Sequence, residues 1–137
     1  MRRIWVNGVF DILHVGHVRL LRQARLMGDH LTVGINSDVS VRRYDKLRSN
    51  GRPFIAQDER AEMLRSIRWV DDVIVFDETD PLAAIEKYGP FTAIVKGVEY
   101  REKNMPERWL DIPIHYVDGG ATHSSDIVDI IRRTDPS

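Results

Sequence analysis

Two histidines that stand three positions apart, His14 and His17, are the residues of this chain best suited to chemistry. They follow a short apolar run at Ile4–Val6, which predicts a strand, and they begin a periodic segment that predicts a helix over Val15–Met27. Backbone N–H groups and the positive end of a helix dipole gather anions at such a turn. Two imidazoles on the first turn of a helix point the same way, and they can carry charge or donate hydrogen bonds to phosphate oxygens. The block therefore predicts a phosphate-binding site.

The rest of the chain alternates between apolar runs and segments with helical periodicity. Strands are expected at residues 4–6, 31–35, 73–76, 93–95 and 112–117, and helices at 15–27, 38–43, 58–67 and 81–88. A last helix is expected to begin at Ser124 or Ser125 and to bury Ile127, Ile130 and Ile131. The polar, aperiodic residues 45–53 are expected to form a mobile loop. The pattern predicts an α/β fold with a doubly wound, Rossmann-like parallel sheet of five strands, in one domain over residues 1–133 followed by a short tail at 134–137.

Candidate ligand-binding residues gather where the expected strands end. In a parallel sheet of this kind, ligands bind at the carboxyl ends of the strands, near a topological switch point. The residues at these places are Gly8 after the first strand, Asn36 after the second, Lys96 and Gly97 after the fourth, and Thr122 to Ser125 at the start of the last helix. Glycine at position 8 lets the backbone approach a phosphate closely. Several polar clusters that converge on one edge of a sheet favour a single site.

Composition excludes several functional classes. The chain has 137 residues, of which 42% are hydrophobic, and a formal net charge of −1, so nothing indicates a nucleic-acid or membrane surface. It contains no cysteine, which excludes disulfides and thiolate metal sites and fits a cytoplasmic location. No apolar run approaches the ~18 residues of a membrane span. The glycine motifs of dinucleotide-dependent oxidoreductases and of P-loop proteins are also missing.

The segment from Asn7 to His17 resembles the signature of the nucleotidyltransferase superfamily, a His-x-Gly-His element after the first strand. The preceding Gly-x-Phe-Asp matches the subgroup that activates small phosphorylated alcohols and sugars. Within it, the pattern is most similar to the adenylyltransferase domain that makes ADP-heptose from a heptose 1-phosphate. The further segments that carry this resemblance are Asn36-Ser37-Asp38, Arg52-Pro53, Val70-Asp71, Val95-Lys96-Gly97, Asp118-Gly119-Gly120 and Ser124-Ser125.

The resemblance implies a role for each matching residue. The catalytic set is His14, His17 and Lys46, and the nucleotide-binding set is Gly8, Val9, Phe10, Gly16, Lys96, Gly97, Ser124 and Ser125. Residues expected to contact phosphate or the acceptor are Asp11, Asn36, Arg52, Glu99, Thr122 and His123. Asp11 either orients its turn or helps to position Mg²⁺ or a substrate hydroxyl. No carboxylate cage for a metal stands out, so Mg²⁺ is expected to arrive with the nucleoside triphosphate.

The implied reaction transfers a nucleoside monophosphate to a phosphorylated sugar or alcohol and releases pyrophosphate. ATP is favoured over CTP because Asp118 stands where the related cytidylyltransferases carry an arginine. The alternatives are a CTP-dependent cytidylyltransferase acting on glycerol 3-phosphate or another small phosphorylated alcohol or phosphonate, and a nucleotide-binding regulator without turnover. His123 and Val98-Glu99 depart from the family pattern, which leaves the acceptor open. A homodimer is possible.

Overall fold

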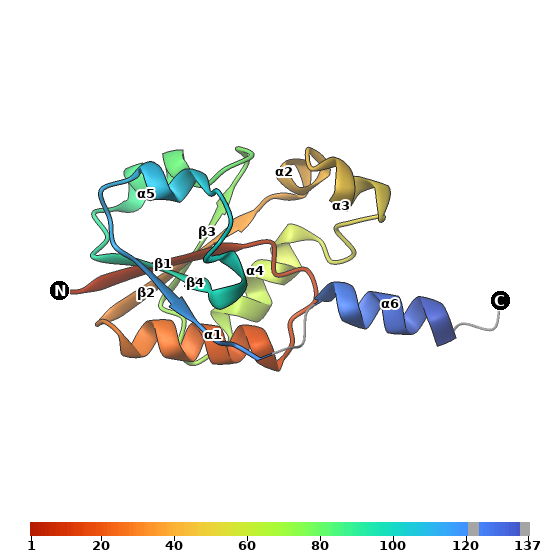
Figure 1. The fold of residues 1–137 in the computed structure, drawn as a ribbon, viewed down its shortest axis with the longest axis horizontal. Helices are drawn as coiled ribbons and strands as arrows, with labels where there is room; N and C mark the ends of the chain where they lie inside the picture. Colours follow the sequence, from red (N-terminus) through yellow and green to blue (C-terminus); the bar gives the residue numbers. More distant parts are fainter. Residues whose placement is uncertain (121–123, 135–137) are drawn as a thin grey trace.

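The computed structural model describes residues 1–120 and 124–134 and shows one α/β domain (Figure 1). The strands are β1 (Arg3–Gly8), β2 (His30–Asn36), β3 (Asp72–Phe76), β4 (Ala93–Gly97) and β5 (Ile114–Val117). The helices are α1 (Val15–Leu26), α2 (Asp38–Arg42), α3 (Asp45–Ser49), α4 (Gln57–Arg65), α5 (Leu82–Tyr88) and α6 (Ser124–Thr134), with two 3₁₀ turns, η1 (Val98–Tyr100) and η2 (Pro106–Trp109). Within this described part, no helix is both long and apolar enough to cross a bilayer.

The five strands are all parallel and lie in the order β3-β2-β1-β4-β5. The chain therefore builds outward from β1 in one direction through β2 and β3, and then returns to add β4 and β5 on the other side. The switch point lies between β1 and β4, where Ile4 pairs with Ala93 and Trp5 with Ile94. Parallel sheets bind ligands beside the carboxyl ends of the strands at such a point. The predicted fold class is confirmed.

Both faces of the sheet are covered, which explains why its strands are so apolar. On one face, α1 and α4 pack against buried side chains of β1 and β2, among them Val6 and Val33, and Leu64 is the α4 side chain buried there. On the other face, α5 packs around the fully buried Trp5, with Phe91 and Ile94 beside it. Figure 1 shows the two layers on either side of the sheet. This double cover holds the ends of β1 and β4 rigidly, so that the residues that follow them have fixed positions.

The segment expected to be a loop at residues 45–53 contains a short helix, so that expectation was wrong for its first half. In α3, the guanidinium of Arg48 lies 2.7 Å from the carboxylate of Asp45 one turn earlier. Asn50 then closes the helix by donating from its side chain to the carbonyl of Lys46, 2.9 Å away. Local polar bonds stabilise the helix, and it buries no side chain. An apolar periodicity could not reveal it.

The last helix begins at Ser124 as expected, but the prediction that it buries Ile130 and Ile131 was wrong. These side chains are 53% and 59% exposed, whereas Val128 is buried. The reason is visible in Figure 1, where α6 projects away from the body of the domain, past the end of the sheet. The helix has an apolar stripe, but only part of it meets the body of the domain. The fifth strand is also shorter than expected, since it begins at Ile114 rather than at residue 112.

Candidate active site

The N-terminus of α1 is capped by imidazole rings. His14 occupies the N-cap position with an extended backbone, and its Nδ1 accepts a hydrogen bond from the N–H of Gly16, 3.1 Å away. His17 reaches back, and its Nδ1 accepts from the N–H of His14 at 3.3 Å. This is a capping box in which two ring nitrogens replace the usual hydroxyl and carboxylate oxygens. Two backbone donors that a helix end leaves unsatisfied are thereby bonded.

These bonds fix the chemical form of both rings. A nitrogen that accepts a hydrogen bond carries no proton, so the neutral tautomer of His14 and of His17 has its proton on Nε2. The two rings stack with their centroids 3.9 Å apart and their planes 27° apart. In this form each ring has an N–H donor at Nε2 beside the positive end of α1, and the role of the pair toward phosphate stays a prediction.

Phe10 holds His17 in place from the preceding turn. Its ring centroid lies 5.0 Å from that of His17, and its side chain is buried. Its backbone has a φ of 52°, in the left-handed region that residues other than glycine rarely adopt. A Cβ at Gly8 would lie 3.0 Å from the Phe10 ring. The turn thus combines a strained residue with a glycine that makes room for it, as turns at functional sites often do.

A small cavity of about 50 Å³ lies directly in front of the histidine pair. It is lined by His14, Gly16, His17, Leu20, Gly97, Glu99, Gly119 and Gly120. The glycines allow three chain segments to approach: a Cβ at position 119 would lie 2.7 Å from the carbonyl oxygen of Gly16, and one at position 97 would lie 2.5 Å from the Glu99 carboxylate. Asp118 shapes the same wall, because its carboxylate accepts from the N–H of Gly120 at 2.9 Å.

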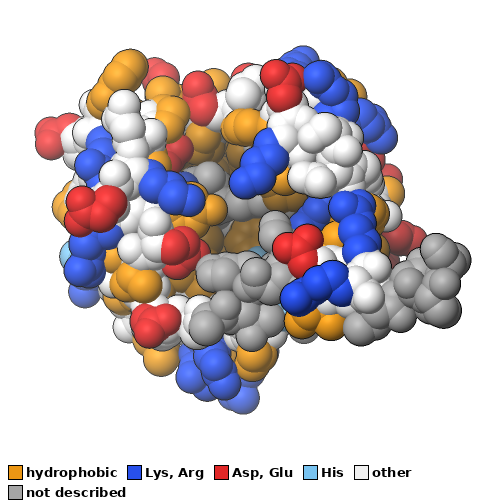
Figure 2. Space-filling view, turned by 45° about the vertical axis from the view of Figure 1, so that its right-hand side comes forward, with side chains coloured by type: hydrophobic (Ala, Val, Ile, Leu, Met, Phe, Trp, Pro, Cys, Tyr) orange, Lys and Arg blue, Asp and Glu red, His pale blue; other side chains and the backbone are white. Residues whose placement is uncertain are grey.

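A second cavity, of about 360 Å³, opens on the other side of the end of β4. Side chains of adjacent strand residues point in opposite directions, so Lys96 lines this cavity while Gly97 lines the first one. Its walls include Gly8 and Val9 at the end of β1, Asn7 and Asn36, and also Tyr44, Asp80, Tyr100, Lys103 and Glu107. Figure 2 shows this side of the molecule hollowed at its centre, with basic and acidic side chains around the rim.

The second cavity contains two tyrosines whose hydroxyl groups hold their protons firmly. Burial raises the pKa of Tyr100 above its usual value, and the Glu99 and Glu107 carboxylates raise it further. The pKa of Tyr44 is also raised, first by burial and then by Asp80 and Glu107, against a smaller opposing effect of a hydrogen bond with Asn36. The Tyr44 hydroxyl donates to the carbonyl of Thr79. The carboxylates near these two hydroxyl groups therefore disfavour additional negative charge beside them.

A buried ion pair locks the turn after β1 to the segment that precedes α4. The guanidinium of Arg52 lies 2.6 Å from the carboxylate of Asp11, with both side chains at least nine-tenths buried. The same carboxylate accepts the N–H groups of Phe54 at 3.0 Å and of Ile55 at 2.9 Å. Asp11 thus orients its turn in this structure, and a role in positioning Mg²⁺ or a substrate hydroxyl stays a prediction.

Arg60 makes the second lock from inside the fold. It is 1% exposed and donates to the carbonyls of Val9 and Asn36, each at 2.8 Å. It also contacts the Asp38 carboxylate at 2.8 Å. One buried side chain therefore sets the relative position of the ends of β1 and β2, and with it the wall of the second cavity.

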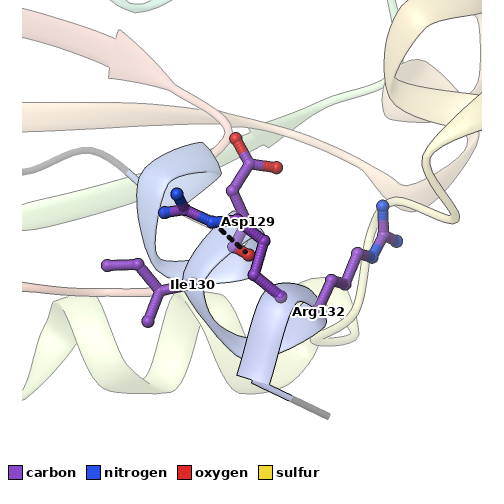
Figure 3. Close-up of a pocket in the computed structure, with 4 residues that line it drawn as sticks. Asp129, Ile130 and Arg132 are labelled. Carbon is purple, nitrogen blue, oxygen red and sulfur yellow. Dashed lines mark hydrogen bonds between the residues drawn. The ribbon is translucent and has the colours of Figure 1, made fainter. Parts of the chain in front are cut away.

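Lys46 stands apart from the histidine pair in this structure. It is exposed on α3 and lines a third cavity, of about 230 Å³, together with Arg52 and residues of α6. Arg132 points from α6 toward α3 (Figure 3) and donates to the carbonyl of Asn50 at 3.0 Å. Figure 3 also shows the outer surface of α6, where a hollow of about 540 Å³ is lined by that helix alone and contains none of the predicted site residues.

The structure thus brings together most of the predicted residues around the ends of β1 and β4. Thr122 and His123 lie outside the described residues, as do the side chains of Ser124 and Ser125, so their roles remain predictions. Sequence reasoning missed Glu107, Tyr44, Tyr100 and Arg60. No periodicity marks them, although a glutamate within the apolar cluster around η2 and an arginine on the buried face of α4 were available signals. In the described ranges, no group of three or more potential metal ligands gathers.

We predict that Arg52→Leu lowers the free energy of unfolding by ~3–5 kcal/mol, because it leaves the Asp11 carboxylate buried without its cation. The double variant Asp11→Asn/Arg52→Leu removes both charges and should lose clearly less than Arg52→Leu alone. Urea denaturation followed by circular dichroism measures both. Equal losses in the two variants would contradict a charge-based lock.

The comparisons with known proteins agree with this geometry. The profile of the cytidylyltransferase-like family matches residues 5–120. The bifunctional protein HldE of Geobacter sulfurreducens is 48% identical over 99 residues, which cover 72% of this chain and 19% of that protein. HldE of Geotalea uraniireducens is 44% identical over 128 residues, 93% of this chain and 24% of that protein. The chain therefore spans about a fifth to a quarter of the length of these relatives.

A solved structure extends the likeness to the whole fold. The lipopolysaccharide core biosynthesis protein of Thermoplasma volcanium superposes with a TM-score of 0.68 and 25% identity, covering 88% of this chain and 99% of that one. The family resemblance predicted from the His14-to-His17 block is confirmed by these matches. The histidine-capped turn, the two cavities beside β4 and the matched profile lead to one assignment: this chain belongs to the cytidylyltransferase-like family.

Proposed function

We propose that this domain transfers a nucleoside monophosphate from ATP to a phosphorylated sugar, with release of pyrophosphate. The observation that carries the proposal is the pair of stacked, Nδ1-capped imidazoles at the N-terminus of α1, which line a cavity beside the end of β4. Parallel Nε2–H donors next to a helix N-terminus suit the oxygens of a phosphate under attack. Membership of the cytidylyltransferase-like family supports the same reaction class.

The reaction needs no protein nucleophile. An oxygen of the acceptor's phosphate attacks the α-phosphorus of the triphosphate, a new P–O bond forms, and the bond to the β-phosphate oxygen breaks as pyrophosphate leaves in line. The attacking oxygen is already anionic, so a general base is unnecessary. Catalysis then depends on positioning and on stabilising negative charge at the α-phosphate and the leaving group. His14 and His17 would donate to these oxygens, and Lys46 would approach the β- and γ-phosphates if α3 moves toward the site.

Mg²⁺ fits this proposal as a partner of the triphosphate. It prefers an octahedral shell of oxygens and commonly keeps phosphate and water ligands. The buried carboxylate of the turn, Asp11, already accepts three hydrogen-bond partners and is satisfied by Arg52. The oxygens of the triphosphate would then be the main ligands of the ion. When bound, the ion would neutralise part of the charge on the leaving group.

The proposed acceptor is a sugar phosphate such as heptose 1-phosphate. Support comes from the motif pattern at Asn7 and Asn36, which resembles the heptose-type adenylyltransferase domain, and from the position of both residues in the second cavity. This cavity, of about 360 Å³, has room for a sugar and adjoins Gly8 and Val9, where a close backbone approach suits a phosphate. The acceptor's phosphate would lie at that end, toward the histidine turn.

We predict that His17→Ala and His17→Asn each lower kcat by at least ~100-fold, because each removes a donor that stabilises the transition state. Asparagine places an oxygen near the position of Nδ1, so His17→Asn should keep the hydrogen bond to the N–H of His14 and leave stability within ~1 kcal/mol of the unmodified protein. Pyrophosphate release with ATP, Mg²⁺ and a panel of sugar phosphates measures kcat.

His115→Ala provides a matched control, because this histidine is exposed on β5 and lines neither of the two cavities beside β4. It should leave turnover unchanged. Near-normal turnover in a folded His17→Asn protein would remove the proposed catalytic role of the ring.

We further predict that a non-cleavable ATP analogue binds at least ~10-fold more tightly than the CTP analogue, since each unmatched polar group in a base pocket costs ~1–3 kcal/mol. Asp118 presents carboxylate oxygens, whereas an arginine at that place would donate to the carbonyl of cytosine. Calorimetric titration of the two analogues measures the difference. Tighter CTP binding, with CTP-dependent pyrophosphate release, would instead favour a cytidylyltransferase for a small phosphorylated alcohol.

A further inference from the structure

The second cavity contains a buried ion pair that the proposed phosphoryl chemistry does not use. The Nζ of Lys96 lies 3.0 Å from Oε2 of Glu107, and the two side chains are 8% and 3% exposed. Lys96 also donates to Oδ1 of Asn7 at 3.3 Å and lies 5.5 Å from the centroid of the Tyr100 ring. All four residues line the cavity. The pair is therefore part of its wall, at the end of β4.

The presence of Glu107 reverses the simplest interpretation of Lys96. A lone buried lysine in the wall of a cavity would attract an anionic ligand. Here its charge is already matched by a carboxylate in direct contact, and the remaining charged residues of the cavity, Asp80 and Lys103, also balance each other. An added anionic group would therefore find no net attraction to the pair that could offset the loss of its own hydration. Carboxylate, amide and phenol groups are well suited to hydrogen bonds with sugar hydroxyls.

A contribution to the stability of the fold does not by itself explain why such a pair is buried. Burying two charges costs desolvation energy, and an apolar pair of similar volume is often equally stable or more so. The neighbouring Met105 and Leu110 show that this part of the chain packs apolar side chains where it can. A charge pair in the wall of an open cavity is better explained by the molecule that the cavity accepts.

We infer that Glu107 is a specificity-determining residue: by neutralising Lys96, it makes the cavity accept the neutral, hydroxyl-bearing end of a phosphorylated sugar or polyol and reject a second anionic group there. This inference rests on the proposed function, because it concerns the acceptor of that reaction. The raised pKa values of Tyr44 and Tyr100 agree with it, since Glu107 contributes to both after burial. Glu107 acts on the acceptor both through its own hydrogen bonds and through the charge of Lys96.

The test compares two probes, mannose 1-phosphate and mannose 1,6-bisphosphate, by calorimetric titration in the presence of the non-cleavable ATP analogue. The unmodified protein should bind the monophosphate more tightly. Glu107→Gln keeps the size of the side chain but exposes the charge of Lys96, so it should shift the affinity ratio toward the bisphosphate by ~10-fold or more, as expected for one uncompensated charge at an effective dielectric constant of ~20.

Two more variants separate charge from shape. Lys96→Gln leaves Glu107 without its cation and should shift the ratio the other way, against the bisphosphate. The double variant Lys96→Gln/Glu107→Gln removes both charges, so its ratio should return to within ~3-fold of the unmodified protein, as a purely electrostatic coupling requires. Glu102→Gln is the matched control, because this carboxylate is exposed in the same connection between β4 and β5 and lines no part of the cavity; its ratio should not change.

An unchanged ratio in a folded Glu107→Gln protein would overturn the inference, and so would binding of neither probe by the unmodified protein. If Glu107→Gln does not fold, the opposite shift in Lys96→Gln and its reversal in the double variant decide the matter. The proposed reaction can be rejected independently of this inference. If no nucleotide releases pyrophosphate, the ratio of the two affinities still reports on the charge of the cavity. Conversely, turnover that depends on His17 together with an unchanged ratio would reject only the role of Glu107.

Discussion

Two hydrogen bonds from the backbone to imidazole nitrogens hold the candidate active site together. Because Nδ1 of His14 and Nδ1 of His17 accept N–H groups at the start of α1, the rings are fixed in position and in tautomer at the same time. The same two side chains therefore cap the start of α1 and carry the N–H donors that would face a phosphate. The strained Phe10 and the glycines around the turn all serve this arrangement. A substitution there affects folding and chemistry together, unless it preserves the acceptor at Nδ1.

The sheet supplies the second constraint, since it decides what lies beside the histidine turn. The order of the strands places β4 next to β1, and the alternation of side chains at the end of β4 divides the space into two cavities. Gly97 allows close approach on one side, whereas Lys96 and its partner Glu107 form a polar wall on the other. Arg52 holds the turn after β1 through a buried ion pair with Asp11, and the buried Arg60 holds the ends of β1 and β2 by donating to the carbonyls of Val9 and Asn36. Two cavities on either side of the end of β4 suit a reaction in which two ligands must meet at one phosphorus atom.

The sequence predicted the parallel sheet, its strands and the histidine turn because each rests on a local pattern: an apolar run, a helical period or a motif. It did not predict α3, because this short helix has local polar bonds and no buried apolar face. It also placed Ile130 and Ile131 in the core, because periodicity shows that a helix has an apolar stripe but not how far the stripe is covered. Glu107 was missed for a third reason, since its partner Lys96 is eleven residues away and meets it only through the fold.

The central claim is that both histidines accept backbone bonds at Nδ1 and present a proton on Nε2. Long-range ¹H–¹⁵N correlation spectra of the protein with ¹⁵N-labelled histidine report the tautomer of each ring directly, with His14→Asn and His17→Asn supplying the assignments. The account predicts that at neutral pH both rings are neutral, with an unprotonated Nδ1 and a protonated Nε2. A proton on Nδ1 of either ring, as the other tautomer or as an imidazolium, would contradict it.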